Sequence, residues 1–266
     1  MRLLRAALLT SLVAAGSAYV RAETVPYDHM HLAAPDQAKA VEWYQRMFGG
    51  QPTREGKDRL LFGHTRFIWL KSATAQPSAG STIDHIAFSV PDVDAKMKEL
   101  AAAGVAVIPP VREMSGGMRL GVVEDPWGAR IEVLQDRDRL GFHHVHLRAP
   151  DPQAALSWYQ QRFGGERATL KGGVEGLKYG EMLVLVQKAE TAPAASAGRA
   201  LDHVGWASRT STRRFRVSRG SRSCRIRRSC SWRPARSASR SSRTRTARRS
   251  RSCNAEGRTL NSESGQ

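Results

Sequence analysis

Cysteine is missing from the body of this 266-residue sequence. The three cysteines, Cys224, Cys230 and Cys253, all lie in one arginine- and serine-rich stretch near the C-terminus. A disulfide framework is therefore excluded for the remainder of the chain. After residue 22 the sequence also has no apolar run long enough to cross a bilayer, which excludes a membrane-spanning helix there.

The body also has almost no net charge. The formal net charge of +18 would ordinarily indicate a nucleic-acid or membrane partner. However, 17 arginines lie between Ser208 and Cys253, where there is no lysine, aspartate or glutamate, and they account for nearly all of that charge. We therefore expect no nucleic-acid partner for the body of the protein.

The first 22 residues are typical of a secretory signal peptide. Arg2 and Arg5 precede an apolar run at residues 6–15, and small residues near Ala22 form a cleavage site. A frayed amphipathic helix is the alternative interpretation. The signal peptide predicts a periplasmic or secreted protein with no membrane association after cleavage.

The body contains an internal repeat. HMHLAAPDQAKAVEWYQRMFGG, which begins at His29, returns as HVHLRAPDPQAALSWYQQRFGG, which begins at His144. The segments DHIAFSVPD and DHVGWAS start in the same way, and their histidines are His85 and His203. Four related starts at similar spacing indicate a duplicated structural unit.

Each unit predicts the same order of elements. In the first, an apolar strand at residues 27–34 ends at Pro-Asp, and Asp36 caps a helix that Gly49 terminates. The second repeats this plan and closes with a tight turn at residues 125–128 and a strand at residues 129–134. The sequence therefore predicts an α+β protein of tandem βαβββ modules, which must share a core in pairs.

The arginine-rich stretch has three interpretations: a basic arm that binds nucleic acid, a solvated low-complexity tail, or a module read in a shifted frame. For SRTRTARRSRSC at residues 242–253, one permitted choice of codons yields EDPDRTPVEVV two bases later. This peptide matches EDPWGARIEVL, which starts at Glu124 in the second module. The match favours a frameshifted fourth module and predicts a disordered tail in the chain as written.

We therefore predict four parts. They are a signal peptide at residues 1–22, a first domain of two paired modules at 23–139, a second domain at 140–207 and the tail at 208–266. The second domain holds a complete third module and the first strand of a fourth.

The module starts, with their WY…FGG helices, and the EDPWGARIEV hairpin resemble the vicinal oxygen chelate superfamily over about residues 27–207. This superfamily includes glyoxalase I, extradiol dioxygenases, and the fosfomycin and bleomycin resistance proteins. The resemblance implies that paired modules form half-open barrels with a divalent metal in the concavity.

Glu132 lies between Ile131 and Val133, so its carboxylate faces one side of a strand whose other side is apolar. Such a carboxylate is either a solvent-facing edge residue or, if buried, is paired or metal-bound. The resemblance implies that His29, His85 and Glu132 bind Fe, Mn, Zn or Ni, with coordination positions left open for substrate. It also implies that His144 and His203 belong to a second site; histidines in a core are the alternative interpretation.

His31 and His64 are predicted to act in catalysis, although hydrogen bonding within the barrel is an alternative role for His31. We expect an exported metal-dependent enzyme that acts on a small oxygen-bearing molecule, either a lyase or isomerase or an extradiol-type dioxygenase. Glyoxalase I is less well matched, because the strand FIWLKSA lacks its additional glutamate. The alternative is a non-catalytic pocket protein similar to bleomycin resistance proteins. A homodimer is compatible with either function.

Overall fold

The structure, a computed structural model, describes residues 23–114 and 117–207. The predicted signal peptide and the arginine-rich tail, with its proposed shift of reading frame, lie outside the described residues. Within the described part of the chain, no helix has the length and apolar character needed to cross a membrane.

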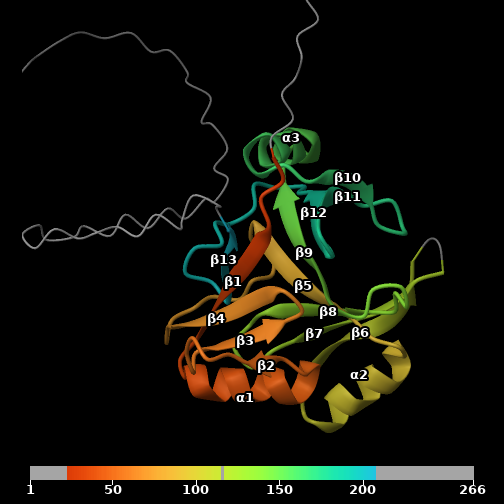
Figure 1. The fold of residues 1–266 in the computed structure, drawn as a ribbon. Coiled ribbons are helices and arrows are strands. Elements are labelled where there is room, and N and C mark those ends of the chain that lie inside the picture. The colour runs from red at the N-terminus through yellow and green to blue at the C-terminus, as the bar shows by residue number, and fades with distance from the viewer. Residues whose placement is uncertain (1–22, 115–116, 208–266) are drawn as a thin grey trace, which may run out of the picture. The chain divides into compact units, whose positions relative to one another are not determined.

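The described residues form an α+β fold of three complete βαβββ modules and the first strand of a fourth (Figure 1). The first module contains β1 (Tyr27–Ala34), α1 (Gln37–Phe48), β2 (Gln51–Pro52), β3 (Arg59–Phe62) and β4 (Thr65–Lys71). The second contains β5 (Ile83–Ser89), α2 (Val93–Ala102), β6 (Ala106–Glu113), β7 (Arg119–Glu124) and β8 (Arg130–Leu134). The third contains β9 (Gly141–Ala149), α3 (Pro152–Phe163), β10 (Glu166–Thr169), β11 (Glu175–Tyr179) and β12 (Met182–Lys188), and β13 (Leu201–Trp206) follows.

The Pro-Asp motif sets the start of the first and third helices, and Asp92 serves the second in the same way. The Asp36 carboxylate accepts hydrogen bonds from the backbone N–H groups of Ala38 and Lys39 at 3.1 and 3.2 Å. Asp92 and Asp151 accept equivalent bonds at the starts of α2 and α3. These bonds satisfy N–H groups that have no partner within a helix, so the predicted caps are confirmed.

The strands form two sheets whose composition differs from the expectation. The five-stranded sheet has the order β13-β1-β4-β3-β2, and the eight-stranded sheet has the order β10-β11-β12-β9-β5-β8-β7-β6. The second module is therefore paired with the third through β5 and β9, while the first module pairs with the single strand β13. The four first strands are similar in sequence, so the repeat alone does not identify which of them are neighbours.

The predicted division between residues 139 and 140 stays a prediction, but the eight-stranded sheet runs continuously across it. The antiparallel β5–β9 pair joins His85 to His146 and Ala87 to His144. In the five-stranded sheet, the equivalent pair of β1 and β13 joins His31 to His203 and His29 to Gly205. The same register recurs in both sheets, so each sheet gathers histidines from two modules.

The helices cover one face of the sheets and leave the histidines on the other. Helix α1 packs against β4, α2 against β6 to β8, and α3 against β9, β11 and β12. The Tyr44 hydroxyl of α1 donates a 2.8 Å hydrogen bond to Asp125 in the β7–β8 turn, which links the first two modules. A second, smaller group of buried side chains lies apart from the main core and includes Ala87, Leu120 and Leu185.

Candidate metal centre

Four side chains from the second and third modules meet in one buried group, which we call the Glu132 site: His85, His144, His146 and Glu132. One ring nitrogen from each of the three histidines lies within 4.8 Å of the others. The Nε2 atoms of His85 and His144 lie 3.6 and 3.8 Å from the two oxygens of the Glu132 carboxylate. These separations are too long for hydrogen bonds.

The Nε2 atoms of all three histidines are buried and have no hydrogen-bond partner. Such atoms are rare, because an unpaired buried polar group costs free energy. Glu132 is itself only 7% exposed. Three unpartnered Nε2 atoms and one buried carboxylate therefore face a common centre, where a bound cation would satisfy them.

In His85 and His144 the other ring nitrogen, Nδ1, is held by a neighbouring group. Nδ1 of His85 lies 2.8 Å from the carboxylate of Asp84. Nδ1 of His144 lies 2.9 Å from Nδ1 of His143, whose Nε2 lies 3.3 Å from Asp136. A proton on each Nδ1 of the two ligating histidines leaves Nε2 as the acceptor, which is the tautomer that metal-binding histidines require.

The electrostatics agree with this assignment of protons. Burial lowers the pKa of His144 and of His146 well below the usual value, so both rings are neutral at neutral pH. Burial would raise the pKa of Asp84, but hydrogen bonds from His85 and the Gly80 N–H outweigh it and hold that pKa below its usual range. Burial raises the pKa of Glu132, against the opposing effects of His85 and Arg112.

The Glu132 site opens into a cavity of about 260 Å³. His85, His146 and Glu132 line it, together with polar residues and an apolar wall that includes Leu120 and Val122. A small molecule in this cavity would therefore contact the histidine and carboxylate groups directly.

A second group of histidines, which we call the three-histidine cluster, occupies the other sheet and consists of His29, His31 and His203. A ring nitrogen from each lies within 4.8 Å of the others. Nδ1 of His29 lies 2.7 Å from Asp28, and Nδ1 of His203 lies 2.5 Å from Asp202. Each of these histidines is thus oriented by the preceding aspartate, as His85 is by Asp84.

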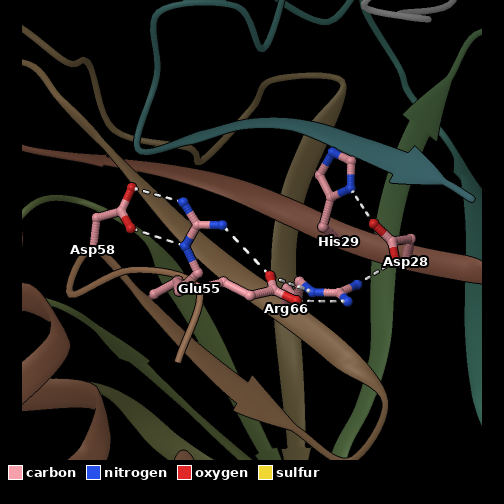
Figure 2. A network of polar contacts seen from close by, with 6 residues as sticks. Asp28, His29, Glu55, Asp58 and Arg66 are labelled. Carbon is pink, nitrogen blue, oxygen red and sulfur yellow. Dashed lines mark hydrogen bonds and ion pairs between the residues drawn. The ribbon is translucent and has the colours of Figure 1, made fainter. Parts of the chain in front are cut away.

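Figure 2 shows how the aspartate beside His29 is held. Arg66 donates a 2.5 Å hydrogen bond to Asp28 and a 3.0 Å hydrogen bond to Glu55. Asp28 therefore pairs with arginine as well as with His29, and Asp202 pairs with His203 and the Gly198 N–H. Both carboxylates contact the Nδ1 atom of the adjacent histidine, whereas Glu132 faces Nε2 of His85.

The structure divides the ligands predicted from sequence. It brings His85 and Glu132 together, but it places His29 in the three-histidine cluster, because β1 is the neighbour of β13 rather than of β5. The predicted second pair is divided too, since His144 joins His85 whereas His203 joins His29 and His31. The structure therefore does not bring His29 together with His85 and Glu132.

The two predicted catalytic residues lie elsewhere. His31 belongs to the three-histidine cluster. His64 is exposed in the turn between β3 and β4 and lines a different cavity, with Tyr27 and Phe142. Neither residue is part of the Glu132 site.

The sequence-based prediction assigned no site role to His146, which is part of the Glu132 site, or to His143, which contacts His144. His146 is two residues from His144 on the same face of β9, and this spacing was visible in the motif HHVH. His143 lies at an irregularity in the β5–β9 pairing, where it contacts both His144 and Asp136, and no local pattern reveals the contact with Asp136. Its role follows only from the path of the chain after β8.

Comparison with known proteins agrees with the fold. A family described as the Glyoxalase/Bleomycin resistance protein/Dioxygenase superfamily matches residues 27–133. The uncharacterized protein Mb0911c of Mycobacterium bovis is 31% identical over 116 residues, which cover 37% of this chain and 75% of that protein. The uncharacterized protein Rv0887c of Mycobacterium tuberculosis is also 31% identical, over 37% of this chain and 67% of its own length.

The chain belongs to the glyoxalase/bleomycin resistance protein/dioxygenase superfamily. The resemblance predicted from the module starts is thereby confirmed. Among solved structures, a glyoxalase I mutant from Zea mays matches with a TM-score of 0.55 and 16% identity, over 68% of this chain and 73% of that one. Wild-type Zea mays glyoxalase I gives a TM-score of 0.50 at 14% identity, over 68% and 70%. At these identities the structural matches support the superfamily fold and not a particular activity.

The residues of the Glu132 site fit the divalent metal that this superfamily uses. Ligand atoms about 2.0–2.2 Å from an ion lie roughly 3.0–3.6 Å from one another. The separations of 3.6 and 3.8 Å between Glu132 and its two histidines need a contraction of only a few tenths of an ångström. The three-histidine cluster offers nitrogen donors alone among its described members.

Proposed function

We propose that the protein is a divalent-metal-dependent enzyme acting on a small oxygen-bearing molecule, with His85, His144 and Glu132 as the metal ligands. The observation that carries this proposal is the set of buried, unpartnered Nε2 atoms around a buried carboxylate. Imidazole and carboxylate ligands without a thiolate suit Fe, Mn, Zn or Ni. When bound, the ion would act as a Lewis acid toward oxygens of the substrate.

The chain's own residues supply the remaining functions. Asp84 holds the ring of His85, and the pair of Asp136 and His143 holds the ring of His144, so both ligands are fixed in orientation. The Nε2 atom of His146 is unpartnered beside the cavity and can accept a proton from a bound substrate.

Metal analysis of the full chain tests this proposal. Protein purified without added metal and then dialysed against Fe(II), Mn, Zn or Ni should retain about one ion per chain. Glu132→Gln should lose most of that ion, because the amide is a much weaker ligand than the carboxylate. Glu113→Gln, on the exposed part of β6, is the matched control and should retain it.

Turnover assays with catechols and α-hydroxy-carbonyl compounds then separate a ring-cleaving dioxygenase from a lyase or isomerase. Loss of turnover with a chelator supports the enzyme. A folded chain that binds no metal would contradict the proposal. It would favour the alternative function, a protein that sequesters a small molecule without metal, as bleomycin resistance proteins do.

Export remains part of the proposal and is supported only by residues 1–22 of the sequence. Mass spectrometry of protein recovered from the producing cells tests it, because cleavage after Ala22 would leave Glu23 as the new N-terminus.

A further inference from the structure

The cavity beside the Glu132 site carries three arginines. Arg112 comes from β6, Arg130 from β8 and Arg148 from β9, and all three line the same cavity as His85, His146 and Glu132. The acidic residues that line this cavity are Asp84 and Glu132. Positive groups therefore outnumber negative ones, and a divalent ion at the Glu132 site would add two further positive charges.

The arginines are only partly satisfied by protein groups. Arg130 and Arg148 share one carboxylate, that of Asp84, at 3.5 and 3.2 Å. The Arg148 Nε atom is the one that faces Asp84, whereas the buried Nε atom of Arg130 makes no hydrogen bond. Asp84 also accepts from His85 and from the Gly80 N–H, so its two oxygens serve four cationic or donor groups. The two guanidinium groups retain donors for another acceptor, and about a third of each side chain is exposed.

Arg112 has no carboxylate within 4 Å among the residues that the structure describes. It is exposed, and its charge acts on the Glu132 carboxylate. An unpaired arginine beside a metal-ligand carboxylate has no structural role visible in the packing of β6. Its position in the cavity lining is suited to binding a ligand.

We propose that the substrate is a small organic acid, whose carboxylate is bound by Arg112, Arg130 and Arg148 while its neighbouring oxygen faces the Glu132 site. Only the placement of the neighbouring oxygen at the Glu132 site rests on the proposed function. The binding of the carboxylate by the arginines does not depend on it. A guanidinium group offers paired N–H donors that match the two oxygens of a carboxylate. The cavity of about 260 Å³ lies at the lower limit of typical ligand pockets, about 300–1,000 Å³, and so limits the acid to a small one.

Equilibrium dialysis of the full chain with radiolabelled glycerate tests the inference, with glycerol as the uncharged analogue. Glycerate should bind to chelator-treated protein and bind more tightly to metal-loaded protein, whereas glycerol should not bind to the chelator-treated form. Arg112→Gln should weaken glycerate binding about tenfold or more in both forms, since a hydrogen bond to a charged group is lost. Arg112→Lys should restore part of the affinity.

Arg119→Gln is the matched control, because Arg119 lies on β7 but pairs with Asp94 of α2, on the helical side of the sheet. Its glycerate affinity should equal that of the wild type. Equal weakening in Arg112→Gln and Arg119→Gln would overturn the inference, as would binding of methyl phosphate tighter than that of glycerate.

Failure of the inference and failure of the proposed function are distinguishable. Metal binding that depends on Glu132, without any arginine-dependent glycerate binding, would refute the organic acid and leave the metal centre. Arginine-dependent glycerate binding to a chain that never retains metal would support the acid-binding cavity and refute the metal enzyme.

Discussion

The two histidine groups of this protein arise from the same repeated motif, yet they differ in chemistry. Each lies where the first strands of two modules pair in antiparallel register. Three pairs of residues hold equivalent positions in the Glu132 site and the three-histidine cluster: His144 and His29, His146 and His31, and His85 and His203. The equivalence shows that a histidine motif locates a potential site without defining its ligands.

The difference lies in the strands beside the histidines. In the Glu132 site, β8 is the neighbour of β5 and places Glu132 opposite Ala87. In the three-histidine cluster, β13 takes the place of β5 and has no second neighbouring strand among the described residues, while β4 beside β1 places Ile68 opposite His31. Burial differs too, since His144 is 1% exposed whereas the residues of the three-histidine cluster are half-buried. The carboxylate and the burial together make the Glu132 site the stronger candidate for binding metal.

Replacing the aspartates that orient equivalent histidines should separate the two groups most clearly. Asp84→Asn should weaken metal binding by about 10- to 100-fold, because the charged partner of a ligating histidine is lost. Asp202→Asn, the equivalent change beside His203, should leave that affinity unchanged. Competition with a chromogenic chelator measures both values, and equal weakening in the two variants would contradict the distinction.

Adding a carboxylate to the three-histidine cluster should reduce the difference in metal affinity between the two histidine groups. Ile68 faces the same side of the sheet as its β-partner His31, and Phe67 and Trp69 face the core. Ile68→Glu should therefore supply a carboxylate beside three histidines and raise the affinity of a second metal ion by about tenfold. Ile68→Gln is the uncharged control. A titration in which both variants match the wild type would show that the carboxylate is not what the cluster lacks.

The tyrosines at equivalent positions of α1 and α3 make different contacts. This difference gives a smaller test of the comparison, in which the free energy of unfolding is measured. Tyr44 of α1 donates to Asp125, whereas the equivalent Tyr159 of α3 packs beside Trp206 with ring centroids 5.5 Å apart. Burial raises the pKa of Asp125 to about 6. Because the folded protein binds this proton more tightly than the unfolded chain, the resulting stabilisation is present below pH 4 and is lost as the pH rises through 6.

Asp125→Asn should remove this dependence of stability on pH. Between pH 4 and pH 7, the free energy of unfolding of the wild type should fall relative to the variant by up to about 3 kcal/mol. Urea unfolding at each pH measures the difference. Glu181→Gln, on the exposed β11–β12 turn, controls for the loss of one negative charge and should follow the wild type. Parallel curves for Asp125→Asn and the wild type would contradict the assigned pKa.

The sequence predicted the modules well and their partners poorly. The Pro-Asp caps, the turn at Asp125 and the alternation of side chains are local features, so the βαβββ order followed from them. The sequence left open whether Glu132 is solvent-facing or buried, and the structure buries it. Which first strand pairs with which depends on contacts between segments far apart in the chain. His29 and His144 stand at equivalent positions in the repeat, and only the pairing of β5 with β9 decides that His144 is the partner of His85.

The metal centre depends on the pairing of the second and third modules. The amount of metal bound per chain tests this pairing most directly. The full-length wild type, His144→Ala and His29→Ala should be loaded with the same ion, dialysed and analysed side by side. The structure predicts about one ion per chain in the wild type and in His29→Ala, and nearly none in folded His144→Ala. Loss of the ion from His29→Ala with retention in His144→Ala would contradict it and would favour a site shared by the first two modules.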